Sequence, residues 1–306
     1  MIMKIAAITI TYNDDYKFEE WCSHYEEYKQ DIDVHIIVDN GSSLEYLQKV
    51  KKYFVDSIVI ERKTNGGCTA AYNDGIKKAL SDKDVDAVLL IANDLKLSEN
   101  AIPILYDLLY SDINIGMVAP IEMKIGSNLI MEYGSTITSG LYMKSLHKGA
   151  KKDELKSSIQ YAEAVLGGAN MASRQFYEIV GLQDELLFMY SDEVDMGIRA
   201  KEKGFKLAVT SDAQVWHYHI NPPKCAIRKP YAAYLIGRNK VYIATKIGIY
   251  KTIYVFIVQM SIVCRNYIIN INSVGYRNYY YYYFRGIIDG ITKKMNSILF
   301  RKLIEN

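Results

Sequence analysis

The chain has 306 residues, half of them hydrophobic, and its formal net charge at pH 7 is +2. This length and apolar content suffice for a large core, and they exclude a disordered tail or a miniprotein held together by disulfides. The four cysteines form no C-x-x-C pair and no metal-binding spacing, so we expect free thiols in a reducing compartment.

The small net charge conceals two regions of opposite charge. Residues 1–223 carry 23 Lys and Arg against 33 Asp and Glu, whereas residues 224–306 carry 14 against 2. A basic region joined to an acidic body indicates that the two meet different partners. We therefore predict a body of residues 1–223 and a basic, helical region of residues 224–306, rich in Tyr and Ile, with the boundary after Pro222-Pro223.

The first apolar run, residues 4–10, leads straight into polar residues without a small-residue cleavage site. It therefore predicts a first buried strand rather than a signal peptide, and we expect a cytoplasmic protein. Similar runs rich in Ile and Val follow at 34–38, 57–60 and 86–91, with helical periodicity between them at 17–29, 44–53 and 68–80. This alternation predicts βαβ units and a mostly parallel α/β sheet flanked by helices.

The pattern is weaker beyond residue 120. Glycines interrupt residues 121–160, where we expect a loop or hairpin. Helical periodicity returns at 173–180 and 192–203, and a short strand is predicted at 206–210.

Polar clusters follow the ends of the predicted strands. Each cluster alone is equally typical of a turn or a helix cap, but ligands of parallel sheets bind beyond the carboxyl ends of the strands. Their convergence therefore favours a ligand site. The clusters are Thr11-Tyr12-Asn13, Asp39-Asn40-Gly41-Ser42, Asn65-Gly66-Gly67 and Asn93-Asp94.

These clusters suggest particular contacts. A carboxylate just past a strand, as at Asp94, suits Mg²⁺ or Mn²⁺, which prefer oxygen ligands. Asp39 is placed to accept a hydrogen bond from a base or a ribose. Asn65-Gly66-Gly67 would let a backbone approach a diphosphate at a helix start. It is not G-x-G-x-x-G, and no Walker A sequence occurs, which argues against a dinucleotide-binding dehydrogenase.

Two later segments carry groups suited to catalysis. Adjacent carboxylates at Asp192-Glu193 suit a general base, although acids also favour any helix N-terminus. His217 and His219 would share one face of a strand, and their spacing does not decide between a ligand and a structural role.

Taken in order, these motifs resemble the inverting family-2 glycosyltransferases, particularly the rhamnosyltransferase-like branch that builds bacterial surface polysaccharides. The resemblance runs from about Lys4 to Asn239 and includes Gly167-Gly168 and Arg238-Asn239. It implies a GT-A fold, with a nucleotide-sugar half at about residues 1–120 and an acceptor half at about 121–223.

The resemblance also implies roles for single residues. Asp94, with His217, would hold the divalent metal. The family's base lies in a Glu-Asp pair that is reversed here, so position gives the role to Glu193 and leaves Asp192 as the alternative. The implied contacts to the donor are Thr11, Tyr12 and Asp39 for the nucleoside, and Asn13, Asn65, Gly67, Asn73 and Asn93 around it.

The implied reaction transfers a sugar, with rhamnose as one candidate, from a nucleoside-diphosphate sugar to a glycan or a lipid-linked glycan, inverting the anomeric carbon. One alternative is a catalytically inactive module that binds nucleotide sugars. Another is a sugar nucleotidyltransferase, which should show a Gly-rich signature with Arg and Lys that residues 9–15 lack.

The basic region suits an interfacial surface. The apolar run at 252–263 is too short to span a bilayer, and Tyr-rich and Lys/Arg-rich segments flank it. We therefore expect peripheral contact with anionic lipid at the inner face of the cell membrane, where a lipid-linked acceptor would lie. The alternatives are a homo-oligomer interface or a helical cap, and no nucleic-acid recognition motif is present.

Overall fold

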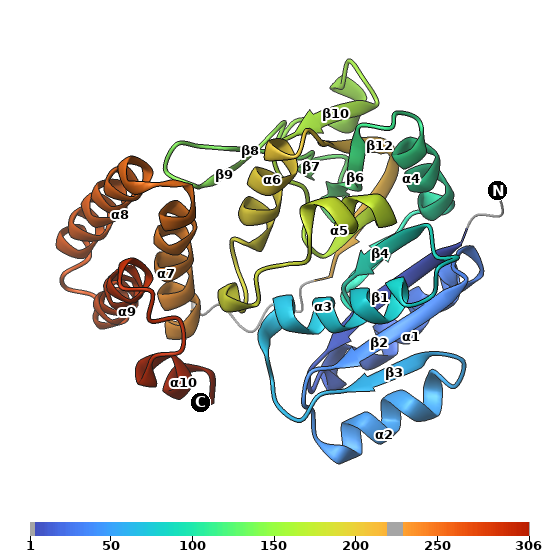
Figure 1. Ribbon diagram of the computed structural model, residues 1–306, viewed down its shortest axis with the longest axis horizontal. Coiled ribbons are helices and arrows are strands. Elements are labelled where there is room, and N and C mark those ends of the chain that lie inside the picture. The colour runs from blue at the N-terminus through green and yellow to red at the C-terminus, as the bar shows by residue number, and fades with distance from the viewer. Residues whose placement is uncertain (1–3, 219–228, 306) are drawn as a thin grey trace. The chain divides into compact units, whose positions relative to one another are not determined.

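The computed structural model describes residues 4–218 and 229–305, so the boundary predicted after Pro222-Pro223 and the side chain of His219 lie outside the described residues (Figure 1). The chain forms two compact units, each built from several segments. The first comprises Met1–Thr136, Met143–Phe188 and Met196–Ile220; the second comprises Ile137–Tyr142, Met189–Asp195 and Asn221–Asn306.

The first unit is built on a ten-stranded sheet in which β1 (Ile5–Thr11) lies between β2 (Val34–Asp39) and β4 (Ala87–Ile91), parallel to both. The order is β10-β12-β6-β11-β4-β1-β2-β3, with β5 on β12 and β7 on β6. The remaining strands are β3 (Ile58–Glu61), β5 (Leu95–Leu97), β6 (Ile115–Met123), β7 (Ile130–Glu132), β10 (Ile159–Ala162), β11 (Ala169–Ser173) and β12 (Lys206–His217), and a separate pair, β8 (Ser135–Ile137) and β9 (Met143–Ser145).

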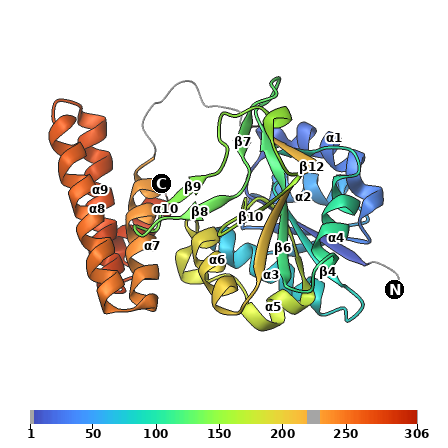
Figure 2. The same ribbon diagram turned by 90° about the horizontal axis from the view of Figure 1, so that it is seen from above.

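Helices cover both faces of this sheet because its central strands are apolar on both sides. In β1, Ala6 and Ile8 pack on one face, and Ile5 and Ala7 on the other. The first face is covered by α3 (Gly67–Leu80), α5 (Arg174–Val180) and α6 (Asp192–Glu202). The second is covered by α1 (Phe18–Tyr28), α2 (Leu44–Tyr53) and α4 (Ala101–Tyr110), as Figure 2 shows. The predicted α/β class is confirmed.

Single turns of 3-10 helix complete the first unit. They are η1 (Asp15–Lys17), η2 (Lys29–Asp31), η3 (Lys152–Glu154) and η4 (Glu185–Leu187). Ser43 begins α2 because its side chain accepts a hydrogen bond from the amide of Tyr46, and Ser173 does the same for α5.

The second unit is helical, as the basic region was predicted to be. It contains α7 (Pro230–Ile247), α8 (Ile249–Ile269), α9 (Val274–Ile291) and α10 (Ile298–Glu305). Proline at the first position of α7 has no amide to satisfy, and its fixed φ suits a helix start. The apolar run at 252–263, expected to be too short to span a bilayer, belongs to the longer helix α8, which by length and composition alone could cross a membrane, with a mean hydropathy of 1.5.

Glycines bring the backbones of α7 and α9 together. A Cβ atom on Gly286 would lie 2.0 Å from the carbonyl oxygen of Tyr234, and one on Gly290 would lie 2.4 Å from that of Arg238. Buried polar pairs flank this contact: the hydroxyl of Tyr234 donates to Asp289 at 2.5 Å, and that of Tyr283 donates to Gln259 at 2.5 Å. The close approach therefore depends on the missing side chains.

We expect Gly286→Ala to lower the free energy of unfolding by about 2 kcal/mol or more, because two packed backbones must separate to admit the methyl group. Denaturant unfolding followed by circular dichroism measures this. Gly168→Ala is the control, since its Cβ would meet its nearest neighbour at an ordinary 3.4 Å. Equal stability of the two variants would contradict the close packing of α7 on α9.

Candidate functional site

The carboxyl ends of β1, β2 and β4 bring three predicted clusters to one edge of the sheet (Figure 1). Thr11, the last residue of β1, is paired in register with Asp39, the last residue of β2. Asn93 and Asp94 follow β4 on the other side of β1. Adjacency of the strands thus turns separate sequence motifs into one polar surface.

The carboxylate of Asp14 ties two of these loops together. Its Oδ2 atom accepts hydrogen bonds from Asn93 Nδ2 at 2.8 Å, from the Tyr12 amide at 3.1 Å and from Thr11 Oγ1 at 3.2 Å. Asn93 and Thr11 are buried, whereas the ring of Tyr12 is 45% exposed. Asp14 was absent from the predicted site, although its place in the same polar cluster was a usable signal.

Asp39 is the most incompletely satisfied carboxylate at this edge. It is 1% exposed, and its Oδ2 atom accepts from the amide of Ser42 at 3.1 Å. Its Oδ1 atom is buried without a hydrogen-bond partner. Leaving a buried charged oxygen unpaired is costly, so a hydrogen-bond donor from a ligand would stabilise this position.

The remaining predicted cluster, Asn65-Gly66-Gly67, is a loop held by the side-chain amides of Asn40 and Asn65. Asn40 donates to Asn65 Oδ1 at 3.0 Å and accepts from the Gly66 amide at 3.0 Å, and Asn65 Oδ1 also accepts from the Gly67 amide at 2.9 Å. Gly67 has a φ of +80°, and a Cβ there would lie 2.1 Å from the carbonyl oxygen of Phe188. Only glycine fits, so the first turn of α3 is held in one conformation.

Two residues that were predicted to lie near the nucleotide-sugar donor, Asn13 and Asn73, form hydrogen bonds within the protein. Asn13 accepts from the Ser43 amide at 2.9 Å and thereby joins the loops after β1 and β2. Asn73 donates to the carbonyl of Gln183 at 2.9 Å and to Glu185 Oε1 at 3.0 Å. These hydrogen bonds connect loops to one another, and contact of either residue with a sugar donor stays a prediction.

Strand pairing brings His217 beside Asp94. β5 begins directly after Asp94 and pairs with β12 so that Leu95 is opposite His217. His217 Nε2 then lies 3.3 Å from Asp94 Oδ1, and Lys17 Nζ lies 3.3 Å from Asp94 Oδ2. On its other side, His217 Nδ1 is 3.8 Å from Glu122 Oε1. The strand predicted to end at residue 210 extends to His217, and this extension creates the contact.

The neighbours of Asp94 favour the ionised form of its carboxyl group. Burial raises its pKa, but the hydrogen bond from His217 and the positive charge of Lys17 outweigh burial and lower the pKa to about 2. Burial raises the pKa of Glu122. Lys17 and Glu122 were not predicted, because neither follows a strand end in a recognisable cluster.

The side chains around Asp94 provide only some of the ligands that a divalent cation needs. Among the described residues, no group of three His, Cys, Asp or Glu side chains could hold a metal ion. Asp94 and His217 supply one oxygen and one nitrogen. Because Mg²⁺ and Mn²⁺ commonly take one or two protein ligands together with phosphate oxygens and water, the two residues fit a cation shared with a diphosphate.

The two candidates for the catalytic base, Asp192 and Glu193, lie in the second unit, in the first turn of α6. Burial raises the pKa of Asp192 to about 6, and the nearby charge of Asp195 adds to this. The two preceding residues, Tyr190 and Ser191, have φ angles of 67° and 64°. Non-glycine residues seldom adopt this conformation, and it persists only where the surroundings impose it.

Comparison with known sequences identifies a family. The model of the family described as Glycosyl transferase family 2 matches residues 8–167, just over half of the chain. The low-salt glycan biosynthesis hexosyltransferase Agl10 of Haloferax volcanii is 23% identical over 228 residues, which are 74% of this chain and 72% of that protein.

Solved structures share the fold at low identity. GalNAc-T7 with UDP, GalNAc and Mn²⁺ matches 79% of this chain with a TM-score of 0.63 and 14% identity, and this chain spans 48% of its length. The mannosyltransferase PcManGT of Pyrobaculum calidifontis, in complex with GDP-Man and Mn²⁺, matches 95% of this chain and 88% of its own, with a TM-score of 0.58 and 12% identity. TarS 1-349 of S. aureus matches 96% and 82%, with a TM-score of 0.54 and 14% identity. The predicted GT-A fold is confirmed.

Proposed function

Since the chain belongs to glycosyl transferase family 2, and is therefore a glycosyltransferase, we propose that it transfers a sugar from a nucleoside-diphosphate sugar to a glycan or lipid-linked glycan with inversion. The observation that carries this proposal is the unpaired, buried Oδ1 atom of Asp39 at the strand edge. A base N–H or a ribose hydroxyl would satisfy it. Thr11 and Tyr12, on the adjacent loop, complete the proposed nucleoside contact.

Asp94 and His217 are the residues that would hold a divalent cation, and Mg²⁺ or Mn²⁺ bound there would offset the charge that develops on the departing diphosphate. Support comes from the lowered pKa of Asp94 and from the Mn²⁺ bound in two solved structures of similar fold. Lys17 already neutralises part of the charge of Asp94. Its ammonium group would therefore compete with a cation for Asp94.

The acidic pair supplies the base of the proposed reaction. The carboxylate takes the proton of the acceptor hydroxyl, the acceptor oxygen bonds to the anomeric carbon, and the bond from that carbon to the diphosphate oxygen breaks. Attack opposite the leaving group inverts the centre. Family position favours Glu193, whereas the raised pKa favours Asp192, because a base works best when its pKa is near the operating pH.

The finer identity of the substrates rests on thinner support. The relative in Haloferax volcanii is a hexosyltransferase of glycan biosynthesis, which supports a hexose donor and a glycan acceptor here. Rhamnose and a bacterial surface polysaccharide stay predictions from the motif pattern, and a cytoplasmic location stays a prediction from the cysteines and the N-terminal segment. The excess of basic residues in 224–306 supports peripheral contact with an anionic membrane.

Calorimetric titration with UDP and GDP, with and without Mn²⁺, tests the donor site. We expect Asp39→Asn to weaken nucleotide binding at least tenfold in both conditions, because the hydrogen bond to a charged group is lost. Asp94→Asn should remove only the part of the affinity that depends on Mn²⁺. The matched control is Asp107→Asn, at an exposed position on α4. Wild-type affinity in Asp39→Asn, with or without the metal, would refute the nucleoside contact.

The pH dependence of kcat/KM identifies the base. A general base acts only when deprotonated, so with Asp192 as the base the rate should be constant above about pH 6 and fall about tenfold per pH unit below it. Asp192→Asn should then lower turnover about 100-fold or more and abolish this dependence, while Glu193→Gln keeps it. If Glu193→Gln is the variant that loses turnover and the acidic limb, the roles are exchanged.

A further inference from the structure

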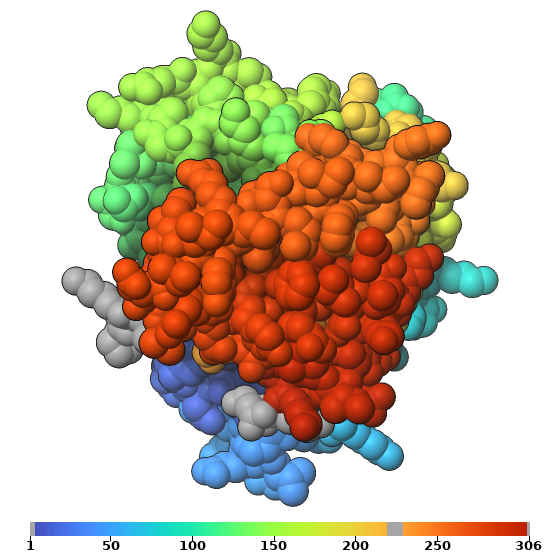
Figure 3. Space-filling model, turned by 90° about the vertical axis from the view of Figure 1, so that its left-hand side faces the viewer, coloured from blue at the N-terminus to red at the C-terminus, as the bar shows by residue number. Residues whose placement is uncertain are grey.

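Helices α8 and α9 follow one another along the chain, and Figure 3 is a view onto the surface that they form. Several large apolar side chains of α8 are exposed. On α8, Ile249, Ile253 and Ile257 follow one another at four-residue spacing and are 66%, 50% and 56% exposed. Further along α8, Ile268 is 67% exposed and lines the groove described below. Exposed apolar surface of this extent is costly in water and marks a contact surface.

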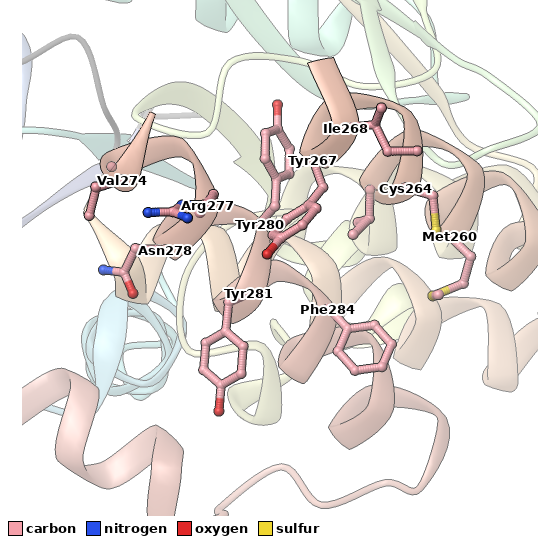
Figure 4. Close-up of a pocket in the computed structure, with 12 residues that line it drawn as sticks. Met260, Cys264, Tyr267, Ile268, Val274, Arg277, Asn278, Tyr280, Tyr281 and Phe284 are labelled. Atoms are coloured by element: carbon pink, nitrogen blue, oxygen red, sulfur yellow. The ribbon is translucent and has the colours of Figure 1, made fainter. Parts of the chain in front are cut away.

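A groove of about 790 Å³ runs between the two helices. Figure 4 shows Arg277 and Asn278 beside Val274 at one end, and Met260 and Phe284 at the other. The lining residues recur at helical spacing and are mostly apolar or aromatic. A volume of this size, with apolar walls and a few polar groups at one end, is typical of a site for a ligand with a long apolar part.

The charges around this groove indicate the chemical class of its ligand. Residues 224–306 carry 14 basic and 2 acidic residues. One of the two acids, Asp289, is buried and accepts a hydrogen bond from Tyr234. Neither α8 nor the part of α9 that lines the groove contains an acidic residue. A phosphate-bearing lipid matches this combination, since its chain is apolar and its headgroup is anionic.

We propose that the α8–α9 groove binds the hydrocarbon chain of an anionic phospholipid of the bilayer, with Arg277 at the lipid phosphate. This proposal rests on the membrane contact of the proposed function and gives it a location. Helices with an apolar face and basic flanks lie in the interface with that face among the acyl chains. Here the two helices would do so together.

Cys264 lies in the groove and is an exposed thiol, so it can carry a reporter. In a variant with the other three cysteines replaced, acrylodan on Cys264 should shift its emission to the blue with vesicles of phosphatidylglycerol and phosphatidylcholine. Vesicles of phosphatidylcholine alone should not cause the shift. Arg277→Gln should weaken vesicle binding about fivefold or more, as expected for one basic side chain at an anionic surface.

Ile268→Glu should abolish the blue shift, whereas the same substitution at Ile179, which is 45% exposed on α5, should leave it unchanged. Both variants should keep their affinity for UDP or GDP, so a failed donor site would be recognised separately. Three results would each overturn the proposal: no shift with anionic vesicles, a shift caused by raised protein concentration alone, or a shift with polyprenyl phosphate in neutral vesicles but not with phosphatidylglycerol.

An independent observation concerns Asn239, on α7. Its side chain is fully buried, and Nδ2 donates to the carbonyl oxygens of Met189 and Tyr190, at 2.8 Å each. These carbonyls belong to the turn that leads into Asp192, in which Tyr190 and Ser191 have positive φ angles. Further along α7, Lys246 pairs with Asp195 in the same turn of α6. Helix α7 therefore contacts the acidic segment both before and after Asp192 and Glu193, the candidates for the base.

We infer that Asn239 is a positioning residue, which holds the base in place through the backbone of residues 189–191. This inference also rests on the proposed function. An amide can donate two hydrogen bonds to two carbonyls, whereas a carboxylate would face them with repulsion. Asn239→Ala and Asn239→Asp should therefore both lower kcat about tenfold or more and leave the KM for the donor within about twofold.

The matched control is Gln259→Ala, because Gln259 is also fully buried and accepts from Tyr142 and Tyr283. It should lose comparable stability and keep kcat. Hydrogen exchange of residues 189–195 should rise in the Asn239 variants and not in the control, whether or not transfer is detected. Wild-type exchange, or equal loss of kcat in the control, would overturn the inference.

Discussion

The pairing of β1 with both β2 and β4 is the constraint on which the proposed donor site depends. All three strands run in the same direction, so their carboxyl ends, and the loops that follow, lie at one edge. The strands are buried on both faces, and a shift of register by one residue would expose their apolar side chains to the wrong environment. Core packing thus fixes the spacing between Thr11 and Asp39 before any ligand is bound.

Side-chain amides and carboxylates have different roles at this edge of the sheet. Asn13, Asn40 and Asn73 can donate and accept at once, and they link loops to one another. The carboxylates of Asp39 and Asp94 are left with capacity for a ligand or are balanced by cationic groups. The amides therefore rigidify the frame, and the carboxylates carry the charge that the proposed nucleoside contact and cation site would require.

Much of the first unit could be predicted from the sequence because its signals are local. The first four strands and the helices between them lie within a residue or so of their predicted bounds, and Thr11, Asp39, Asn93 and Asp94 were found because each ends or follows a strand. Helix α4 and strands β6 and β11 were missed. The residues of β11, Ala-Asn-Met-Ala-Ser, have little intrinsic β propensity and form a strand through antiparallel pairing with β4 and β6. The contacts of Lys17 and Glu122 likewise arise from pairing between segments far apart in the chain.

The contact between Asn239 of α7 and the turn at residues 189–191 has a consequence for folding during synthesis. The turn at residues 189–191 leaves the ribosome about 50 residues before Asn239, the side chain that holds it. Domains generally form from the N-terminus as the chain emerges. The strand edge with Thr11 and Asp39 therefore has all its partners early, while the acidic turn waits for a later helix. A nascent chain can thus acquire the frame of the proposed donor site well before its acidic turn is ordered.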